Sequence, residues 1–562
     1  MLQSFTVTID QAFQLALQHH QAGRLAEAEA IYRQILAVEP CHADALQLLG
    51  VIAHQVGRND VAVDLIRRAL QFKPDYAEAH YNLGTVLSGQ GRTGDAIAAY
   101  RRAIQLKPDY AMAHVNLGNV TKDQGRLEEA MECIRRAVAL NPNCAKAHSN
   151  LVHTLHFYPG EDGGAIASEH LAWNRQFADP LRQFILPNTN DRTPERQLRV
   201  GYVSPDFRQH AISHFLTPLL EAHDRAGFEI YCYASVKLQD AITERMKRSA
   251  NVWRDVLGLC DEALANLIRE DGIDILVDLT QHMADNRLLV FARKPAPVQV
   301  AWLAYPGGTG LEAMDCRLTD AFMEPEGSEW SRSAEEAVRL PDSWFCFDPL
   351  DEYPLPGELP ALRTGHVTFG CLNNFCKVND AVLRRWAGVL HAVEGSRLLL
   401  QCPAGETQGR VRRLMESQGI TADRVELVGR LPRAAFLELF DRMDIALDPL
   451  PYNGGTTTCE ALWMGVPVLT LPGRMTVSRQ GLSILMAAGM PEFIANSEEE
   501  YVKLARDLAG DLPRLAELRK SLRDRMRASA FMDAPRFARN VEAAYREMWR
   551  AWCARQCSNP PL

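Results

Sequence analysis

The stretch DIALDPLPYNGGTTTCEALWMG, residues 444–465, predicts a short buried strand, a turn and the start of a helix. The apolar run 445–450 between turn residues is typical of a buried strand. Three threonines then open a helical run that carries Glu460 in its first turn. The N–H groups and dipole of a helix start attract anions, and glycines let a phosphate approach the main chain. The stretch is interpreted either as an anion site, with Glu460 placed to accept hydrogen bonds from a ribose, or as an ordinary strand-to-helix turn.

The whole chain has 562 residues, which predicts several domains rather than one core. Its 61 Lys and Arg against 70 Asp and Glu leave a net charge of −9, which argues against nucleic acid or acidic lipid as a partner. No apolar run reaches the ~18 residues that cross a membrane, and MLQSFTVTID does not resemble a secretory signal. Thirteen cysteines without a CxxC pair favour reduced thiols, a cytoplasmic location and no structural zinc.

The N-terminal part repeats with a period of 34 over residues 41–74, 75–108 and 109–142. The repeats align small residues and close each unit with a proline: Gly50, Gly84 and Gly118; Gly57, Gly91 and Gly125; Pro40, Pro74, Pro108 and Pro142. This spacing is typical of tetratricopeptide repeats, which are antiparallel helix pairs. It predicts an all-α superhelix over residues 1–155.

Three asparagines share one position of the repeat: Asn82, Asn116 and Asn150. Equivalent positions stack along one face of a solenoid, so these amides would form a ladder. An amide can donate to and accept from an extended peptide backbone, which predicts peptide binding with little sequence preference. The alternative is that each amide is satisfied within its own helix pair.

Residues 156–196 lose the repeat and are rich in turn residues, which predicts a linker. Strand-like runs separated by helical ones follow at 198–203, 228–234, 273–279 and 298–305. The alternation predicts a parallel sheet in a first α/β lobe, residues 197–365.

The carboxyl ends of these strands are where ligands bind in such lobes. The first strand leads to Asp206, His210 and His214. Histidine can accept a hydroxyl proton near neutral pH, so either His210 or His214 is a candidate base, the alternative being a structural histidine. The fourth strand ends in a loop that allows close approach of a substrate on the acceptor side: Tyr305, Pro306 and Gly307.

The strand pattern restarts at 367–374, 397–402, 424–430, 445–450 and 467–473, which predicts a second α/β lobe, residues 366–534. Lys377 follows its first strand and could neutralise a departing diphosphate in place of a metal ion; the alternative is a solvated surface lysine. Residues 535–562 predict a helix that packs back across the lobes. Its Trp549 and Trp552 are expected in a core or interface.

Four motifs resemble those of the O-linked N-acetylglucosamine transferase family: DFRQHAISH (206–214), AYPGGTG (304–310), NNFCK (373–377) and NGGTTTCEALWMGVPVLT (453–470). With the repeats, the resemblance covers nearly the whole chain and is closest to short bacterial members. It implies a superhelix followed by a GT-B glycosyltransferase of two Rossmann-like lobes. It also implies an inverting enzyme that needs no metal or other cofactor and moves N-acetylglucosamine from UDP-GlcNAc to protein Ser or Thr hydroxyls.

The resemblance also implies roles for individual residues. Lys377 would contact the donor diphosphate, Glu460 the ribose, and His210 would act as the base, with His214 close by. Arg433 takes the place of a lysine near the uracil, and the remaining donor contacts by motif are Asn374, Gly454, Gly455, Thr456 and Thr457.

Four positions depart from the animal enzymes: Gly455 and Phe436 each replace a histidine, Cys376 a tyrosine and Asn266 an aspartate. Two other hypotheses therefore stay open. One is a related transferase that uses GDP-fucose or UDP-glucose. The other is a non-catalytic repeat scaffold that binds a nucleotide.

Overall fold

The computed structural model describes residues 8–158, 163–328, 334–350 and 353–555. The chain forms two compact units that divide between Ala147 and His148. Within the described ranges, no helix combines the length and apolar character needed to cross a membrane.

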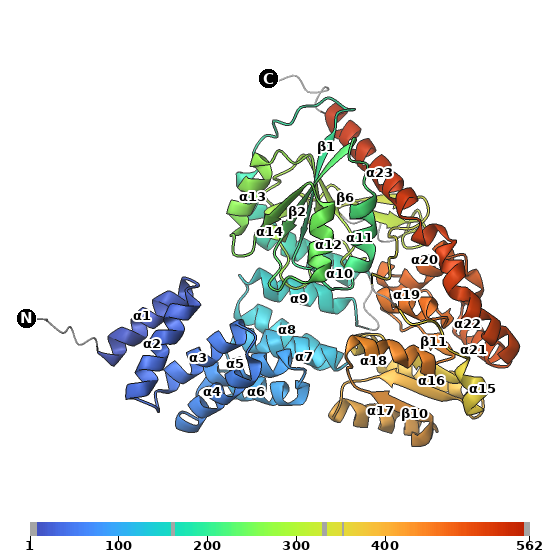
Figure 1. Ribbon diagram of the computed structural model, residues 1–562, viewed down its shortest axis with the longest axis horizontal. Coiled ribbons are helices and arrows are strands. Elements are labelled where there is room, and N and C mark those ends of the chain that lie inside the picture. Colours follow the sequence, from blue (N-terminus) through green and yellow to red (C-terminus); the bar gives the residue numbers. More distant parts are fainter. Residues whose placement is uncertain (1–7, 159–162, 329–333, 351–352, 556–562) are drawn as a thin grey trace, which may run out of the picture. The chain divides into compact units, whose positions relative to one another are not determined.

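The first unit is a series of helical hairpins (Figure 1). Its helices are α1 (Ile9–Gln21), α2 (Leu25–Val38), α3 (Ala43–Gln55), α4 (Asn59–Phe72), α5 (Ala77–Gly89), α6 (Thr93–Leu106), α7 (Ala111–Asp123) and α8 (Leu127–Leu140). This confirms the predicted repeat of two helices per unit.

The repeated glycines explain the tight pairing within each hairpin. A Cβ atom on Gly84 of α5 would lie 2.7 Å from the ring of Tyr100 on α6, and one on Gly118 would lie 2.5 Å from the Ile134 side chain. Only a glycine lets the paired helices approach this closely. Gly91 has a different role, because its φ of 74° turns the chain between the two helices.

The second unit begins within α9 (Ala145–Leu155). The segment interpreted as a linker folds as α10 (Gly163–Trp173), a π-helical turn (Asn174–Ala178) and a 3₁₀ turn (Asp179–Phe184). Trp173 is fully buried. Part of this segment is therefore packed structure, which its turn-rich composition did not indicate.

The first lobe is built on a seven-stranded parallel sheet in the order β3-β2-β1-β4-β5-β6-β7. The strands are β1 (Leu198–Ser204), β2 (Phe228–Ala234), β3 (Val252–Asp255), β4 (Ile275–Asp278), β5 (Val298–Ala301), β6 (Cys316–Asp320) and β7 (Glu336–Leu340). The sequence predicted four of them, β1, β2, β4 and β5, and missed β3, β6 and β7.

The missed strands carry charged residues that hide the apolar pattern. In β6, Arg317 is 8% exposed and forms an ion pair with Glu324, which is 1% exposed. A buried charge is tolerated only with a partner, and this partner comes from outside the strand. No strand periodicity within the sequence reports such a pairing.

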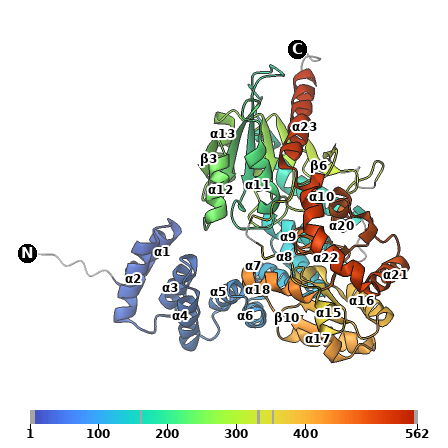
Figure 2. The same cartoon turned by 45° about the vertical axis from the view of Figure 1, so that its right-hand side comes forward.

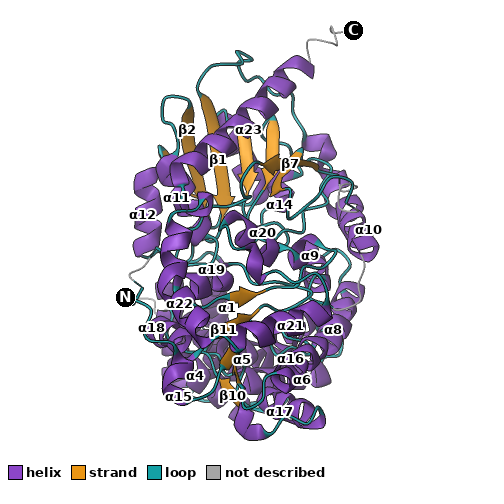
Figure 3. Ribbon diagram, turned by 90° about the vertical axis from the view of Figure 1, so that its right-hand side faces the viewer, coloured by secondary structure: helices purple, strands orange, loops and turns teal. Residues whose placement is uncertain are grey.

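The second lobe contains a five-stranded parallel sheet in the order β10-β9-β8-β11-β12, and Figure 3 shows the strands of the two sheets as separate groups. Its strands are β8 (Thr368–Cys371), β9 (Arg397–Gln401), β10 (Val425–Val428), β11 (Ile445–Leu447) and β12 (Val468–Leu469). All five predicted strands are present, each shorter than its apolar run.

Strand order changes direction between β1 and β4 in the first sheet and between β8 and β11 in the second. Loops that leave the carboxyl ends of strands at such a point form the crevice where α/β proteins bind ligands. Asp206 and His210 follow β1, Lys377 follows β8, and the glycine–threonine segment follows β11. Topology therefore gathers the predicted residues at the two ligand-binding edges.

The last helix, α23 (Ala534–Arg555), runs along the first lobe (Figure 2). Its Glu542 accepts hydrogen bonds from the His223 ring and the Asp224 N–H, at 2.9 and 2.8 Å. Trp549 is fully buried and stacks on Trp552 with ring centroids 4.8 Å apart. The helix returns to the first lobe after the second is complete, as expected.

Candidate active site

Lys377 lies at the carboxyl end of β8, in a 3₁₀ turn (Phe375–Lys377) whose last N–H is accepted by the Asn374 carbonyl at 3.0 Å. Its ammonium donates to the main-chain carbonyl of Asn453 at 2.6 Å and lies 4.2 Å from the centre of the Tyr452 ring. Burial lowers the pKa of Lys377 to about 8, against the opposing effect of Cys376 and Asp448. The side chain is half-buried and fixed, not a freely solvated surface lysine.

Asp448, directly after β11, organises the loop that Lys377 contacts. Its carboxylate accepts the Gly454 N–H and the Thr470 hydroxyl, each at 2.7 Å. Burial raises the pKa of Asp448 to about 7, and these two hydrogen bonds oppose that shift. Asn453 is also fully buried and donates from its amide to the Pro449 carbonyl at 2.8 Å. The turn is therefore held by buried polar groups.

The helix predicted from the threonine run is α19 (Thr456–Trp463), with Gly455 as its N-terminal cap. A Cβ atom on Gly454 would lie 2.4 Å from the Thr458 hydroxyl oxygen, so only glycine fits there. The Thr456 hydroxyl donates across the lobes to the Ala211 carbonyl at 3.3 Å. The helix start therefore directly contacts the loop that carries His210.

His210 is partly exposed beside this contact, with its Nδ1 atom 3.8 Å from a carboxylate oxygen of Asp206. Burial lowers the pKa of His210, while Asp206 raises it and Arg208 lowers it. The net downward shift favours a neutral imidazole at neutral pH, which is the form that accepts a proton.

His214 has different surroundings. It is 3% exposed on α11 (Ser213–Ala222), its Nδ1 bonds the Asp348 carbonyl at 2.9 Å, and its ring stacks on Phe347. Residues 347 and 348 come from the segment after β7, so the histidine joins two parts of the first lobe. These contacts are those of a structural histidine, and they favour His210 as the base.

The loop after β5 is tightly packed. Tyr305 is 1% exposed, with its ring 4.9 Å from that of His156, and a Cβ atom on Gly307 would collide with both rings. The Pro306 carbonyl accepts the hydroxyl of Thr476 from the second lobe. The main chain of this loop thus takes part in contact between the lobes.

Glu460 and Arg433 form an ion pair of 2.5 Å, at the edge of the second lobe. Arg433 begins α18 (Arg433–Glu438), and its guanidinium lies 5.7 Å from the centre of the Phe436 ring. Tyr353 lies in the segment that leads from β7 to β8, which is the crossing between the lobes, and it bonds both Arg433 and Glu460. The structure therefore brings together the two residues expected at the nucleoside end of a donor.

The asparagines of the repeats are not equivalent. The Asn116 amide lies 3.3 Å from the Tyr81 hydroxyl and 3.4 Å from that of Tyr100, so it donates within the repeats. Asn82 occupies the matching place on α5, half-buried. Asn150 is on α9, where its amide nitrogen is buried without a hydrogen-bond partner in the described ranges. Peptide binding along a ladder stays a prediction.

Sequence reasoning missed four residues that shape this site: Tyr353, Asp448, Asn453 and Gln480. The Gln480 amide oxygen lies 3.0 Å from where a Cβ atom of Gly455 would stand. Asp448 and Asn453 lie within the stretch 444–465 and carry a signal, since a polar residue at a strand end beside glycines often anchors a loop. Tyr353 and Gln480 have no local signal.

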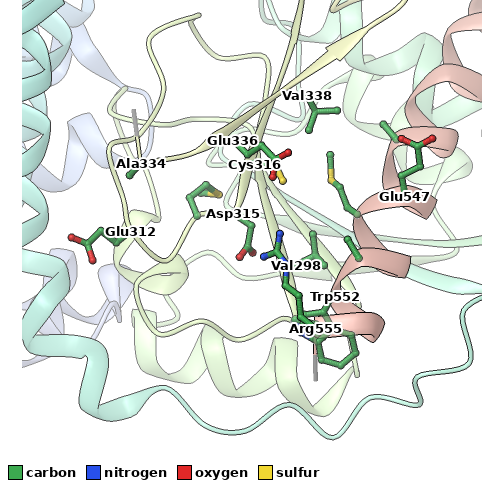
Figure 4. Close-up of a pocket in the computed structure, with 15 residues that line it drawn as sticks. Val298, Glu312, Asp315, Cys316, Ala334, Glu336, Val338, Glu547, Trp552 and Arg555 are labelled. Atoms are coloured by element: carbon green, nitrogen blue, oxygen red, sulfur yellow. The ribbon is translucent and has the colours of Figure 1, made fainter. Parts of the chain in front are cut away.

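A separate pocket lies at the amino ends of β5, β6 and β7 beside α23 (Figure 4). It has a volume of about 430 Å³, and Val298, Cys316, Glu336 and Trp552 are among its lining residues. It contains none of the predicted site residues. Within the described ranges, no group of three or more His, Cys, Asp or Glu side chains is arranged to hold a metal ion.

Comparison with known families agrees with the division of the chain into helical repeats and two α/β lobes. The family model of Glycosyl transferase family 41 matches residues 152–355 and 358–541. Models of tetratricopeptide repeats match residues 13–77, 89–125 and 111–144. The first match contains every donor-side and acceptor-side residue discussed above.

Individual relatives agree with the match to the family model. A solved structure of a mutant of the Thermobaculum terrenum O-GlcNAc transferase is 40% identical, with a TM-score of 0.85 over 92% of this chain and 98% of that one. The probable UDP-N-acetylglucosamine–peptide N-acetylglucosaminyltransferase SPINDLY of Petunia hybrida is 41% identical over 68% of this chain. The corresponding SEC protein of Arabidopsis thaliana is 32% identical over 64%. The matches span only 42% and 38% of those two plant proteins.

Proposed function

The chain belongs to glycosyl transferase family 41, and we propose that it moves N-acetylglucosamine from UDP-GlcNAc to serine or threonine hydroxyls of proteins. The observation that carries the proposal is the bond from Lys377 to Asn453, which places a cation at the glycine–threonine turn. That turn leads into the start of α19, and the start of α19 contacts the His210 loop. The residues proposed to hold the donor therefore lie beside the loop of the proposed base.

The proposed reaction is a direct displacement with inversion. The acceptor oxygen attacks the anomeric carbon, the bond from that carbon to the diphosphate oxygen breaks, and the hydroxyl proton passes to His210. Lys377 and the N–H groups that open α19 stabilise the negative charge on the departing UDP. Because Lys377 supplies a positive charge, the proposal includes no metal ion and no other cofactor.

The proposal also includes a protein acceptor bound by the repeats, a cytoplasmic location and a relationship to bacterial members of the family. The repeats would present the protein acceptor through Asn82, Asn116 and Asn150. None of the twelve cysteines in the described ranges forms a disulfide, which fits a reducing cytoplasm. The 40% identity to the Thermobaculum terrenum O-GlcNAc transferase supports a place beside the bacterial members of the family.

A transfer assay tests the donor. Purified protein is incubated with a serine- and threonine-rich peptide and UDP-GlcNAc, UDP-glucose or GDP-fucose, with and without a metal chelator. Transfer from UDP-GlcNAc in the presence of chelator is the expected result. Transfer only with metal would contradict the proposal that Lys377 takes the place of a metal ion.

A different donor is the second candidate, because Gly455 presents no side chain to the donor where the animal enzymes have a histidine. Efficient transfer from GDP-fucose or UDP-glucose, with none from UDP-GlcNAc, would favour it. Nucleotide binding without transfer or hydrolysis of any of these donors would favour a non-catalytic scaffold.

A further inference from the structure

Tyr353 lies in the crossing between the lobes, and its main chain is anchored to the second lobe. Arg523, on α22 (Leu512–Arg527), donates to the carbonyl of Pro354 and to that of Trp463, both at 2.6 Å. Trp463 is the last residue of α19, the helix that carries Glu460. One buried guanidinium therefore ties the crossing beside Tyr353 to the helix of the donor site.

The hydrogen bonds of the Tyr353 hydroxyl have a defined direction. Arg433 can only donate, so at 2.5 Å its Nη2 atom donates to the Tyr353 oxygen. The Tyr353 proton is then available for Glu460, whose Oε1 atom lies 3.2 Å away. Arg433 also donates from its Nη1 atom to Glu460 Oε1, at 2.5 Å. Three side chains from three separate segments thus form a closed network.

Burial makes this network important for the carboxylate. The Glu460 side chain is 4% exposed, whereas that of Arg433 is 36% exposed. A buried carboxylate is unfavourable without hydrogen-bond donors or an opposite charge, and Tyr353 and Arg433 supply both. Because both approach Oε1, they also fix the orientation of the carboxylate.

We propose that Tyr353 is a positioning residue for binding of the nucleoside end of the donor, which it serves by holding Glu460 toward the ribose and Arg433 toward the base. The inference rests on the proposed function, which assigns a nucleoside diphosphate sugar to this site. Tyr353 acts through its two partners, and the diphosphate end, held by Lys377 and α19, does not depend on it.

The test separates the two ends of the donor. Calorimetry with UDP, GDP and inorganic pyrophosphate compares the full-length wild type with Tyr353→Phe. Loss of a hydrogen bond to charged groups predicts about tenfold weaker binding of the nucleotide that the wild type prefers, with pyrophosphate affinity within about twofold. Tyr231→Phe is the matched control, because Tyr231 also donates to a glutamate, Glu229, at 3.3 Å, but on β2 of the first lobe. This control leaves all affinities unchanged.

A second variant guards against a general effect of Tyr353→Phe on folding. Arg433→Lys keeps the charge and Tyr353 but removes the forked geometry, and it too should weaken nucleotide binding while sparing pyrophosphate. If wild type and Tyr353→Phe bound the nucleotide equally well, the inference about Tyr353 would be overturned and the proposed function would stand. The same holds if Tyr353→Phe lost pyrophosphate affinity as much as nucleotide affinity. Failure of the wild type to bind UDP or GDP would overturn the proposed function as well.

Discussion

The ammonium of Lys377 and the main-chain carbonyl of Asn453 are 2.6 Å apart, across the point where strand order reverses in the second sheet. The lysine follows β8 and the asparagine follows β11, so the contact joins the two loops that flank this point. The carbonyl belongs to the residue before Gly454, at the entrance to the helix start. The cation is therefore placed beside N–H groups that attract the same anion.

Substitution Lys377→Ala is expected to reduce the transfer rate by ~100-fold or more, because it removes a preorganised charge from the leaving group. The fold should remain, since the ammonium bonds a single carbonyl. Initial rates with a peptide acceptor, together with a thermal unfolding curve, measure both effects. Lys503→Ala removes an exposed lysine of the same lobe and is the control. Half of the wild-type rate in Lys377→Ala would remove the lysine from the mechanism.

Nucleotide affinity is expected to depend on pH through the same residue. The pKa of Lys377 is lowered to about 8, so the ammonium is present below that value and is lost above it. UDP affinity should stay level below pH 8 and fall above it by up to tenfold per unit, as measured by calorimetry from pH 6.5 to 9.5. Lys377→Met should bind weakly at every pH without this decline. The same decline in the variant would assign it to another group.

The two histidines should respond differently to substitution. His210→Asn is expected to lower kcat by about 10²–10⁴-fold and to leave UDP affinity unchanged, since a general base acts only in the chemical step. His214→Ala is expected to lower stability by about 1–3 kcal/mol, because it removes a buried hydrogen bond to the Asp348 carbonyl. Steady-state kinetics and thermal unfolding distinguish these outcomes. An unchanged kcat in His210→Asn would exclude it as the base.

Acid should destabilise the packing of α10 against the first lobe. His170 stacks on His282, with ring centroids 5.2 Å apart, and His156 lies beside them. Burial lowers the pKa of His156 to about 3 and that of His282 to about 4, and lowers that of His170 well below its usual value. Their unfolded forms take up protons near pH 6.5, so the stability due to each neutral ring is complete above that pH. As pH falls toward 4, each ring loses about 1.4 kcal/mol of its contribution to the free energy of unfolding per pH unit.

The variant His170→Phe isolates this effect. Buried carboxyl groups with raised pKa values, such as Asp278, titrate in the opposite direction, but they are common to both proteins and cancel in the comparison. The Tm of the variant relative to wild type should therefore rise as pH falls from 7 to 5. A difference in Tm that is independent of pH would show that His170 does not titrate in this way.

Peptide binding along the repeats is tested by Asn82→Ala combined with Asn116→Ala. A ladder that binds peptide backbone predicts a KM for a long acceptor raised about tenfold, with kcat and UDP affinity unchanged. A lower Tm with an unchanged KM would instead assign Asn116 to its bonds with Tyr81 and Tyr100. Steady-state kinetics with long and short peptides, and thermal unfolding, provide these measurements.

Local pattern in the sequence was enough to predict most of the architecture. The period of 34, with Gly84 and Gly118 at helix contacts, predicts the hairpins, because each hairpin depends mainly on its own residues and its neighbours. Apolar runs likewise predict all five strands of the second sheet. Since ligands bind at the carboxyl ends of parallel strands, the positions of Lys377, His210 and the threonine run were predictable as well.

Contacts between distant residues were decided only by the tertiary structure. The strand β6 is hidden in the sequence, because Arg317 is compatible with burial only beside Glu324 and the main-chain carbonyl of Glu335, which lies 18 residues along the chain. The residue pattern left both His210 and His214 as candidate bases, with the family resemblance favouring His210, and contact with residues 347 and 348 separates them. These relationships depend on which groups share a buried environment, and spacing along the chain does not encode that.

The stretch 444–465 shows both sides of this division. The sequence by itself determined its strand, its turn and its helix, because apolar runs, glycines and threonines have local conformational preferences. Only the folded chain determined that Lys377 contacts its turn, that Asp448 holds Gly454, and that Tyr353 and Arg433 surround Glu460. The physical reason is that desolvated charges are stable only with partners, and folding brings those partners from distant positions.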